Sequence, residues 1–438
     1  MNHDPTHGAD SRDDAHGLLP QALHLIAAGL VLGALAGLLA TAFHFALSAA
    51  ERLRENVVAE QLPGGWIFLS LLVAACAYAA SYLVHRFAPE AAGSGVQQVE
   101  AVIRGEAPPS PWIVLPVKFV GGILAIGSGF ALGREGPTVQ MGATAGHLLA
   151  RAFRFNEANS RALLAAGAGA GLAAAFNAPL AGVLFIFEEL IAGFSLRVAI
   201  ASLAACSAAL AIMRSMVGNH PVFVMAPVDV GLFQDYLAFL IFGALIGVLG
   251  IAYNRAVILS LDGFERLQRV PRDVRAAIVG ALVGALAWFA PEVIGSGDRQ
   301  IQELLDASHP ISQMLLFVVL RFILGPISYA PGLPGGLFAP LLVIGAVAGV
   351  LLGNGMQWAI PGVAIPGSVF AAVGMGAMFV AVVRAPLTGV ALAVEMTGAT
   401  GIFIPLMTAC ATAVALPAAL GSRPIYDMLR ERSVTTRA

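Results

Sequence analysis

Residues 131–146 read ALGREGPTVQMGATAG, and residues 334–349 read PGGLFAPLLVIGAVAG. In both stretches a glycine turn is followed by proline and then by a run that carries two more glycines at the same spacing. Glycine permits a tight turn and proline suits the first turn of a helix, so each stretch predicts a turn that opens a helix. The match across 203 positions predicts that one structural unit occurs twice in the chain.

Further matched segments extend this repeat over most of the chain. They are Gly93-Ser94-Gly95 with Gly295-Ser296-Gly297, Lys118-Phe119 with Arg321-Phe322, Ala178-Pro179-Leu180 with Ala385-Pro386-Leu387, and Glu188 with Glu395. Repeated membrane units are often inverted, which brings matching helix ends together at the midplane. We therefore predict two inverted repeats at 20–215 and 228–425, with a polar tail at 1–19, a linker at 216–227 and a short C-terminal tail at 426–438.

The composition places the chain in a membrane. Hydrophobic residues make up 58% of the sequence and charged residues 11%, which is too apolar for a soluble domain. Several apolar stretches reach the roughly 20 residues that cross a bilayer, and shorter ones interrupted by glycine and proline predict broken or re-entrant helices. We predict an all-α polytopic protein with the lipid bilayer as its solvent. The net charge of −2, with one lysine, offers no basic surface for nucleic acid.

Three glycine-rich turns, at 93–95, 133–137 and 335–340, each precede an apolar helical run. A helix N-terminus presents unpaired N–H groups and a partial positive charge, so such a turn favours an anion. Partial charges also release an anion more readily than a buried full charge does. Close helix packing explains any one glycine turn equally well, but three together favour an anion pathway.

Four glutamates lie inside apolar stretches, where each costs about 2.5–3.5 kcal/mol at a membrane helix centre. Glu135 follows a helix-opening turn, so its ionised side chain could occupy an anion's position and leave it on protonation. Glu188 and Glu395 are repeat partners, which predicts a shared structural hydrogen-bonding role. Glu189 has Met396 opposite it in the repeat, and an asymmetric acid is the better candidate for a proton path.

Other polar groups suggest structural roles. Lys118 and Arg321 are repeat partners, and we expect them to satisfy carbonyls or carboxylates within each half. Cysteines and histidines lack metal-ligand spacing, so the sequence predicts no metal or cofactor. An intramembrane enzyme would need a nucleophile and a base, and no such arrangement is found.

These motifs together resemble those of the CLC chloride channel and chloride/proton exchanger family. Gly133-Arg134-Glu135-Gly136-Pro137 is similar to the family's GREGP signature, and Gly336-Leu337-Phe338-Ala339-Pro340 is similar to its GxFxP signature. Gly93-Ser94-Gly95 resembles the start of its GSGIP signature, and Tyr426 falls where the family keeps a pore tyrosine. The resemblance covers about 20 to 430.

The resemblance implies an inverted-repeat fold and a homodimer with one pathway per subunit. It implies a gating glutamate at Glu135 and an internal proton-transfer acid at Glu189. The anion-binding residues that it implies are Ser94, Gly95, Gly136, Leu337, Phe338 and Tyr426, with hydroxyls from Ser94 and Tyr426 and backbone N–H groups from Leu337 and Phe338.

One departure is the pair Val96-Gln97, where the family has isoleucine and proline. A missing proline removes preorganisation from the first turn of a helix, while the serine associated with chloride over nitrate is present. The function predicted is proton-coupled chloride exchange in a bacterial plasma membrane. A passive chloride channel and an exchanger for another small anion, such as fluoride, are the alternatives.

Overall fold

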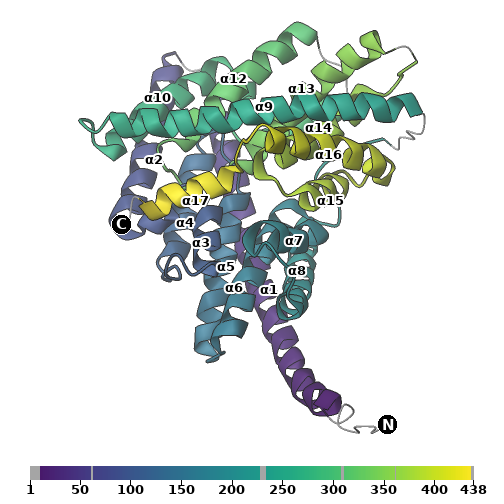
Figure 1. The fold of residues 1–438 in the computed structure, drawn as a ribbon. Coiled ribbons are helices and arrows are strands. Elements are labelled where there is room, and N and C mark those ends of the chain that lie inside the picture. Colours follow the sequence, from purple (N-terminus) through teal and green to yellow (C-terminus); the bar gives the residue numbers. More distant parts are fainter. Residues whose placement is uncertain (1–9, 61–62, 227–232, 307–309, 361, 436–438) are drawn as a thin grey trace.

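The computed structural model describes residues 10–60, 63–226, 233–306, 310–360 and 362–435. That part of the chain forms seventeen α-helices and four short helical segments of other types, with no β-strand (Figure 1). The helices of the first half are α1 (Asp10–Ala59), α2 (Gly65–Phe87), α3 (Val96–Ile103), α4 (Val114–Ile126), α5 (Glu135–Ala152), α6 (Glu157–Phe176), α7 (Pro179–Phe185) and α8 (Leu196–Val217). Those of the second half are α9 (Phe233–Arg266), α10 (Arg272–Phe289), α11 (Asp298–Asp306), α12 (Ile311–Tyr329), α13 (Phe338–Ala359), α14 (Gly367–Val383), α15 (Pro386–Thr397), α16 (Phe403–Ala419) and α17 (Ile425–Thr435).

The predicted tails and linker lie only partly in this region. From residue 10 the predicted polar tail belongs to α1, and residues 1–9 lie outside the described residues. Residue 227 of the linker, 228–232 of the second repeat and 436–438 of the C-terminal tail also lie outside them. From Ile425 onward, the described part of the C-terminal segment is the helix α17.

Seven described helices are long and apolar enough to cross a bilayer. They are α1 from Ala22, α2, α8, α9, α12, α13 and the segment Thr400–Ala419 that contains α16. Helices α4, α14 and α15 are apolar but shorter, at 13, 17 and 12 residues. A helix of 12 residues rises about 18 Å, less than the roughly 30 Å of hydrocarbon, so the predicted class of broken membrane helices is confirmed.

Most spans expose large apolar side chains on their outer faces, for example Leu71 of α2 and Leu316 of α12. Helices α13 and α14 differ, because α13 is buried inside the protein from Phe338 to Val350 and α14 from Val369 to Val383. The interior of the second half therefore forms around α13 and α14, and the outer helices carry the exposed apolar side chains. This division is expected for a multi-pass membrane protein, whose charged and irregular segments must be enclosed by protein.

Glycine permits close helix contacts at matching places in the two halves. A Cβ on Gly142 of α5 would lie 2.1 Å from the carbonyl oxygen of Gly167 in α6. Similarly, a Cβ on Gly345 of α13 would lie 2.3 Å from the carbonyl oxygen of Gly374 in α14. Both glycines of the predicted repeat thus allow a backbone-to-backbone approach typical of membrane helices.

The two halves also meet through reciprocal contacts. Gly133 N–H donates to Gly336 O at 2.8 Å, and Gly336 N–H donates to Gly133 O at 2.7 Å. Gly133 and Gly336 are repeat partners, so this contact joins equivalent residues of the two halves, as a two-fold relation requires. The predicted fold class, two inverted repeats with broken helices, is confirmed. Figure 1 shows α17, in yellow, which packs against α3 of the first half.

Candidate functional site

Two helix starts from opposite halves meet at the Gly133–Gly336 bridge. Helix α5 begins at Glu135 and α13 begins at Phe338, two residues after the bridge in each case. Their N-cap residues, Arg134 and Leu337, provide no side-chain acceptor to the first turn. The partial positive ends of both helices therefore converge on the same buried region.

A third helix start lies against the first turn of α5. Gly95 is the N-cap of α3, with a left-handed φ of 87°. A Cβ on Gly136 would lie 2.4 Å from Ser94 Oγ, so glycine is needed there for Ser94 to approach. Ser94 is fully buried, and its Oγ is 3.5 Å from Tyr426 Oη of α17. The predicted residues Ser94, Gly95, Gly136 and Tyr426 thus lie together.

Phe338 and Leu337 complete this group from the second half, and both are buried. The Phe338 ring packs edge-on against Tyr426, with centroids 5.7 Å apart. It also contacts Phe185 at 5.8 Å and Phe379 at 5.0 Å. Because the neighbours are aromatic, the backbone N–H groups and two hydroxyls are the polar groups that these residues offer an anion.

Glu135 occupies the meeting point of α5 and α13. Its side chain is 2% exposed, and its carboxylate accepts a backbone hydrogen bond from Ala339 in the first turn of α13. A Cβ on Gly133 would lie 2.0 Å from Glu135 Oε2, so the carboxylate folds back over the glycine turn. The carboxylate thus places negative charge where helix N-termini favour it.

Glu189 lies in a different helical segment from Glu135. It belongs to the π-helical segment Ile186–Leu190 that follows α7. The charges of Glu100 and Asp427 act on Glu189, and the charges of Glu189 and Glu135 both act on Tyr426. The two predicted acids therefore lie on different helices, and both are near enough to Tyr426 to act on it electrostatically.

Tyr329 of α12 is a site residue that sequence reasoning missed. Ser94 N–H donates to Tyr329 Oη at 3.3 Å, and the Gln97 side chain also hydrogen-bonds to this tyrosine. Gln97 thereby ties the first turn of α3 to α12 at the position where the family has proline. The sequence does contain a signal for Tyr329. It is a tyrosine in an apolar helix, and the matching position of the other repeat holds Ile126, which has no hydroxyl.

The predicted roles of the buried cations are confirmed. Lys118 Nζ donates to the carbonyl oxygens of Ala91 at 3.0 Å and Gly93 at 2.7 Å. Arg321 Nη1 donates to Gly295 O at 2.6 Å. Each cation holds the carbonyl of the first glycine in its own GSG turn, so the repeat is preserved in contacts as well as in sequence.

The predicted structural role of Glu188 and Glu395 is also confirmed, in a reciprocal form. Glu188 accepts the backbone N–H groups of Leu387 and Thr388 at 2.9 and 2.7 Å, and the Thr388 hydroxyl at 2.7 Å. Glu395 accepts the N–H groups of Leu180 and Ala181 at 3.0 and 2.9 Å. Glu188 thus caps the start of α15, the helix that holds Glu395, and Glu395 caps the start of α7, the helix that precedes Glu188. Both capped helices begin with proline.

The family model described as "Voltage gated chloride channel" matches residues 76–417, which include α3, α5 and α13. The chain belongs to this family. The resemblance stated from the sequence motifs is confirmed.

No group of three or more His, Cys, Asp or Glu side chains that could hold a metal ion occurs in the described ranges.

Similar proteins are exchange transporters by name. The chain is 36% identical to the H(+)/Cl(-) exchange transporter ClcA of Vibrio parahaemolyticus, over 96% of this chain and 91% of that protein. It is 38% identical to ClcA of Vibrio cholerae, over 92% of this chain and 88% of that protein. Among solved structures, a slow cyanobacterial Cl−/H+ antiporter matches with a TM-score of 0.88 and 32% identity, covering 94% of this chain and 98% of the antiporter.

Proposed function

We propose that this protein exchanges chloride for protons across a membrane. The chain is a multi-pass membrane protein of the family described above. The similar proteins named as Cl−/H+ exchangers or antiporters span nearly its whole length. This similarity supports exchange, and the geometry gives each predicted residue a role in it.

The anion binds where α3, α5 and α13 begin. Hydroxyls of Ser94 and Tyr426 donate to it, and backbone N–H groups from Gly95, Gly136 and the Leu337–Phe338 pair surround it. Partial charges and hydroxyl groups replace part of the hydration shell without the tight hold of a full positive charge. A small spherical anion therefore binds and leaves readily.

Glu135 acts as gate and proton acceptor. Its carboxylate lies against the first turn of α13, where the anion also binds, so carboxylate and chloride compete for one position. Protonation removes the negative charge and lets the side chain leave. The same event takes up a proton and opens the anion path, which is the coupling that an exchanger needs.

Glu189 passes protons to and from the opposite side of the membrane. The observation that carries this proposal is that the Phe338 ring contacts both Tyr426 and Phe185, and Phe185 directly precedes the π-helical segment that holds Glu189. Protons and anions then share the region around Tyr426 and separate beyond it. A passive channel would lack this second acid, and the arrangement therefore favours exchange.

The assembly proposed is a homodimer in a bacterial inner membrane, with one pathway in each subunit. A single chain supplies all the residues around the site, so the dimer adds stability to complete pathways. Transport, with no catalysed reaction, is the proposed activity. A detergent-solubilised particle of monomer mass that transports at the normal rate would contradict the dimer.

Glutamine variants of the two acids test the proposal in liposomes. Glu135→Gln, which resembles the protonated form, should carry chloride while proton movement is abolished. Glu189→Gln should preserve chloride flux and also stop protons, because its role concerns protons alone. If Glu189→Gln moves protons against their gradient at wild-type coupling, the proton route runs elsewhere and Glu189 is a structural acid.

A further inference from the structure

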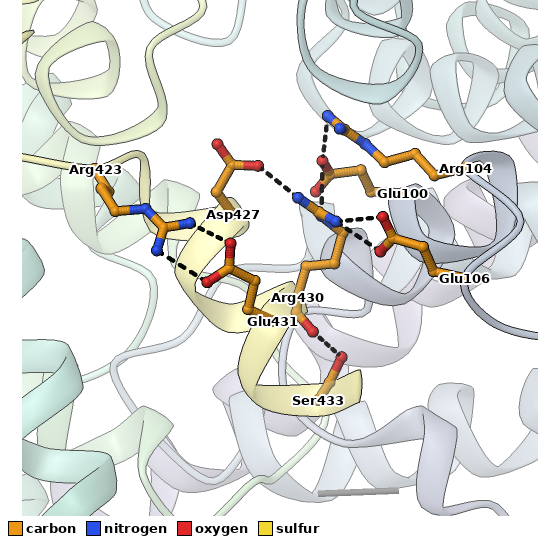
Figure 2. A network of polar contacts seen from close by, with 8 residues as sticks. All are labelled: Glu100, Arg104, Glu106, Arg423, Asp427, Arg430, Glu431 and Ser433. Carbon is orange, nitrogen blue, oxygen red and sulfur yellow. Dashed lines mark hydrogen bonds and ion pairs between the residues drawn. The ribbon is translucent and has the colours of Figure 1, made fainter. Parts of the chain in front are cut away.

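The helix that carries Tyr426 is held by a cluster of charged side chains. We define the Arg430 cluster as Glu100, Arg104, Glu106, Asp427 and Arg430, all labelled in Figure 2. Arg430 Nη1 donates to the two Glu106 carboxylate oxygens at 2.7 and 2.6 Å, and Nη2 donates to Asp427 Oδ1 at 3.0 Å. Arg430 Nε lies 3.1 Å from Glu100 Oε1, which also pairs with Arg104 at 2.8 Å. One guanidinium thus joins three carboxylates.

The cluster joins α17 to the α3 region, which are also the two elements that carry the Tyr426 and Ser94 hydroxyls. Tyr426 and Arg430 are four residues apart on α17, so they lie on one face of that helix. Ser94 lies just before α3, and Glu100 lies within it. The face of α17 therefore contacts the α3 region twice, through hydroxyls near its start and through charges one turn later.

Burial makes the charged contact persistent. Arg430 is 9% exposed and Glu100 is 1% exposed. Burial alone would lower the pKa of Arg430, but hydrogen bonds to Glu106 and Asp427 and the charge of Glu100 raise it above its usual range. Arg430 therefore stays charged, and water does not readily replace its partners.

Two other arginines, one before α17 and one within it, have different partners. Arg432 pairs with Asp262 and Glu265 of α9 at 2.6 Å each. Arg423 pairs with Glu431, a residue of α17 itself. Both pairs are more exposed than that of Arg430, and their partners lie outside α3. Arg432 therefore offers a matched control on the same helix as Arg430.

We propose that Arg430 is a positioning residue for Tyr426, which fixes α17 against α3 and thereby sets the separation of the Ser94 and Tyr426 hydroxyls. The inference rests on the proposed function, since those hydroxyls are proposed to bind the anion. The charges of Glu100 and Asp427, both in the cluster, also act on Glu189. Loosening the cluster should therefore change anion selectivity and proton coupling together.

The test compares Arg430→Ala, Arg430→Lys and the control Arg432→Ala in liposomes, with chloride-to-nitrate flux ratio and chloride ions moved per proton as readouts. Arg430→Ala should lower the flux ratio by threefold or more and raise the chloride moved per proton. Arg430→Lys should fall between alanine and wild type, because an ammonium lacks the fork that joins several carboxylates. Arg432→Ala should match wild type in both readouts.

If Arg430→Ala fails to fold, Glu106→Gln provides the second variant. The Glu106 side chain is 36% exposed, and the change weakens two contacts of Arg430 without removing the arginine. It should shift both readouts in the same direction by a smaller factor. Wild-type flux ratios in the folded Arg430 or Glu106 variants, or an equal shift in Arg432→Ala, would overturn the proposal. A wild-type protein that moves chloride without protons refutes exchange, while the flux ratio still tests Arg430.

Discussion

Replacing Glu188 with glutamine should destabilise the protein without changing its chloride-to-proton coupling. The carboxylate accepts three hydrogen bonds at the start of α15, from Leu387 N, Thr388 N and Thr388 Oγ1. Glutamine keeps one acceptor oxygen, but it replaces the other oxygen with an NH2 group. This NH2 group cannot accept the hydrogen bonds that the backbone N–H groups and the Thr388 hydroxyl donate. At least one charge-assisted hydrogen bond is lost, which costs about 1.5–3 kcal/mol. The lost negative charge at a helix N-terminus adds about 0.3–1 kcal/mol.

The expected fall in the free energy of unfolding is therefore about 2–4 kcal/mol. Denaturant titration in mixed micelles measures it. Glu395→Gln should also destabilise, by a somewhat smaller amount, because Glu395 accepts two backbone bonds and no hydroxyl bond. The two caps share no partner, so the double variant should be additive within about 0.5 kcal/mol.

Glu157→Gln is the control for charge removal, because Glu157 is 79% exposed and pairs with Arg161 on the surface of α6. Because Glu157 is the first residue of α6, the loss of its charge and of its surface ion pair should together cost about 1.5 kcal/mol or less. An unfolding free energy for Glu188→Gln equal to that of wild type would refute the capping argument. So would a folded Glu188→Gln variant that loses proton transport selectively, since that outcome assigns Glu188 to the proton path.

Three further substitutions test the anion site. Ser94→Pro removes the hydroxyl near Tyr426 and the N–H that Tyr329 accepts, so the chloride-to-nitrate flux ratio should fall; an unchanged ratio contradicts the role of Ser94. Tyr329→Phe leaves the Ser94 N–H without its acceptor, which costs about 1–3 kcal/mol, and should lower the same ratio while chloride transport persists. Gly136→Ala places a Cβ 2.4 Å from Ser94 Oγ and should reduce chloride flux more than tenfold, whereas the control Gly355→Ala, with open space around it, should transport normally.

The helix starts at the site could be predicted from the sequence because their signals are local. Glycine and proline fix the turns that precede Glu135 and Phe338, and the structure begins α5 and α13 at these residues. The GSG turn likewise predicted a helix start, and α3 begins at Val96, directly after Gly95. Backbone preferences of single residues were enough for these predictions.

Partners distant in the chain could be predicted only where the repeat indicated them. Symmetry implied that Glu188 and Glu395 have one role, but it did not specify that each caps the other's matching helix. Tyr329 and Arg430 have no such indication, because their partners Ser94 and Glu100 lie 235 and 330 positions away. Their contacts depend on how α12 and α17 pack against α3, which local sequence patterns do not determine.

The most direct test of the central claim, coupled exchange, is a pH recording from liposomes that contain the wild-type protein and an outward chloride gradient. With no initial pH difference, chloride leaving the vesicles should drive protons inward, so the lumen acidifies while external chloride rises in a fixed ratio to the protons taken up. Glu135→Gln liposomes should release chloride without this acidification. Chloride release from wild-type liposomes with no proton uptake would contradict exchange and identify the protein as a passive chloride channel.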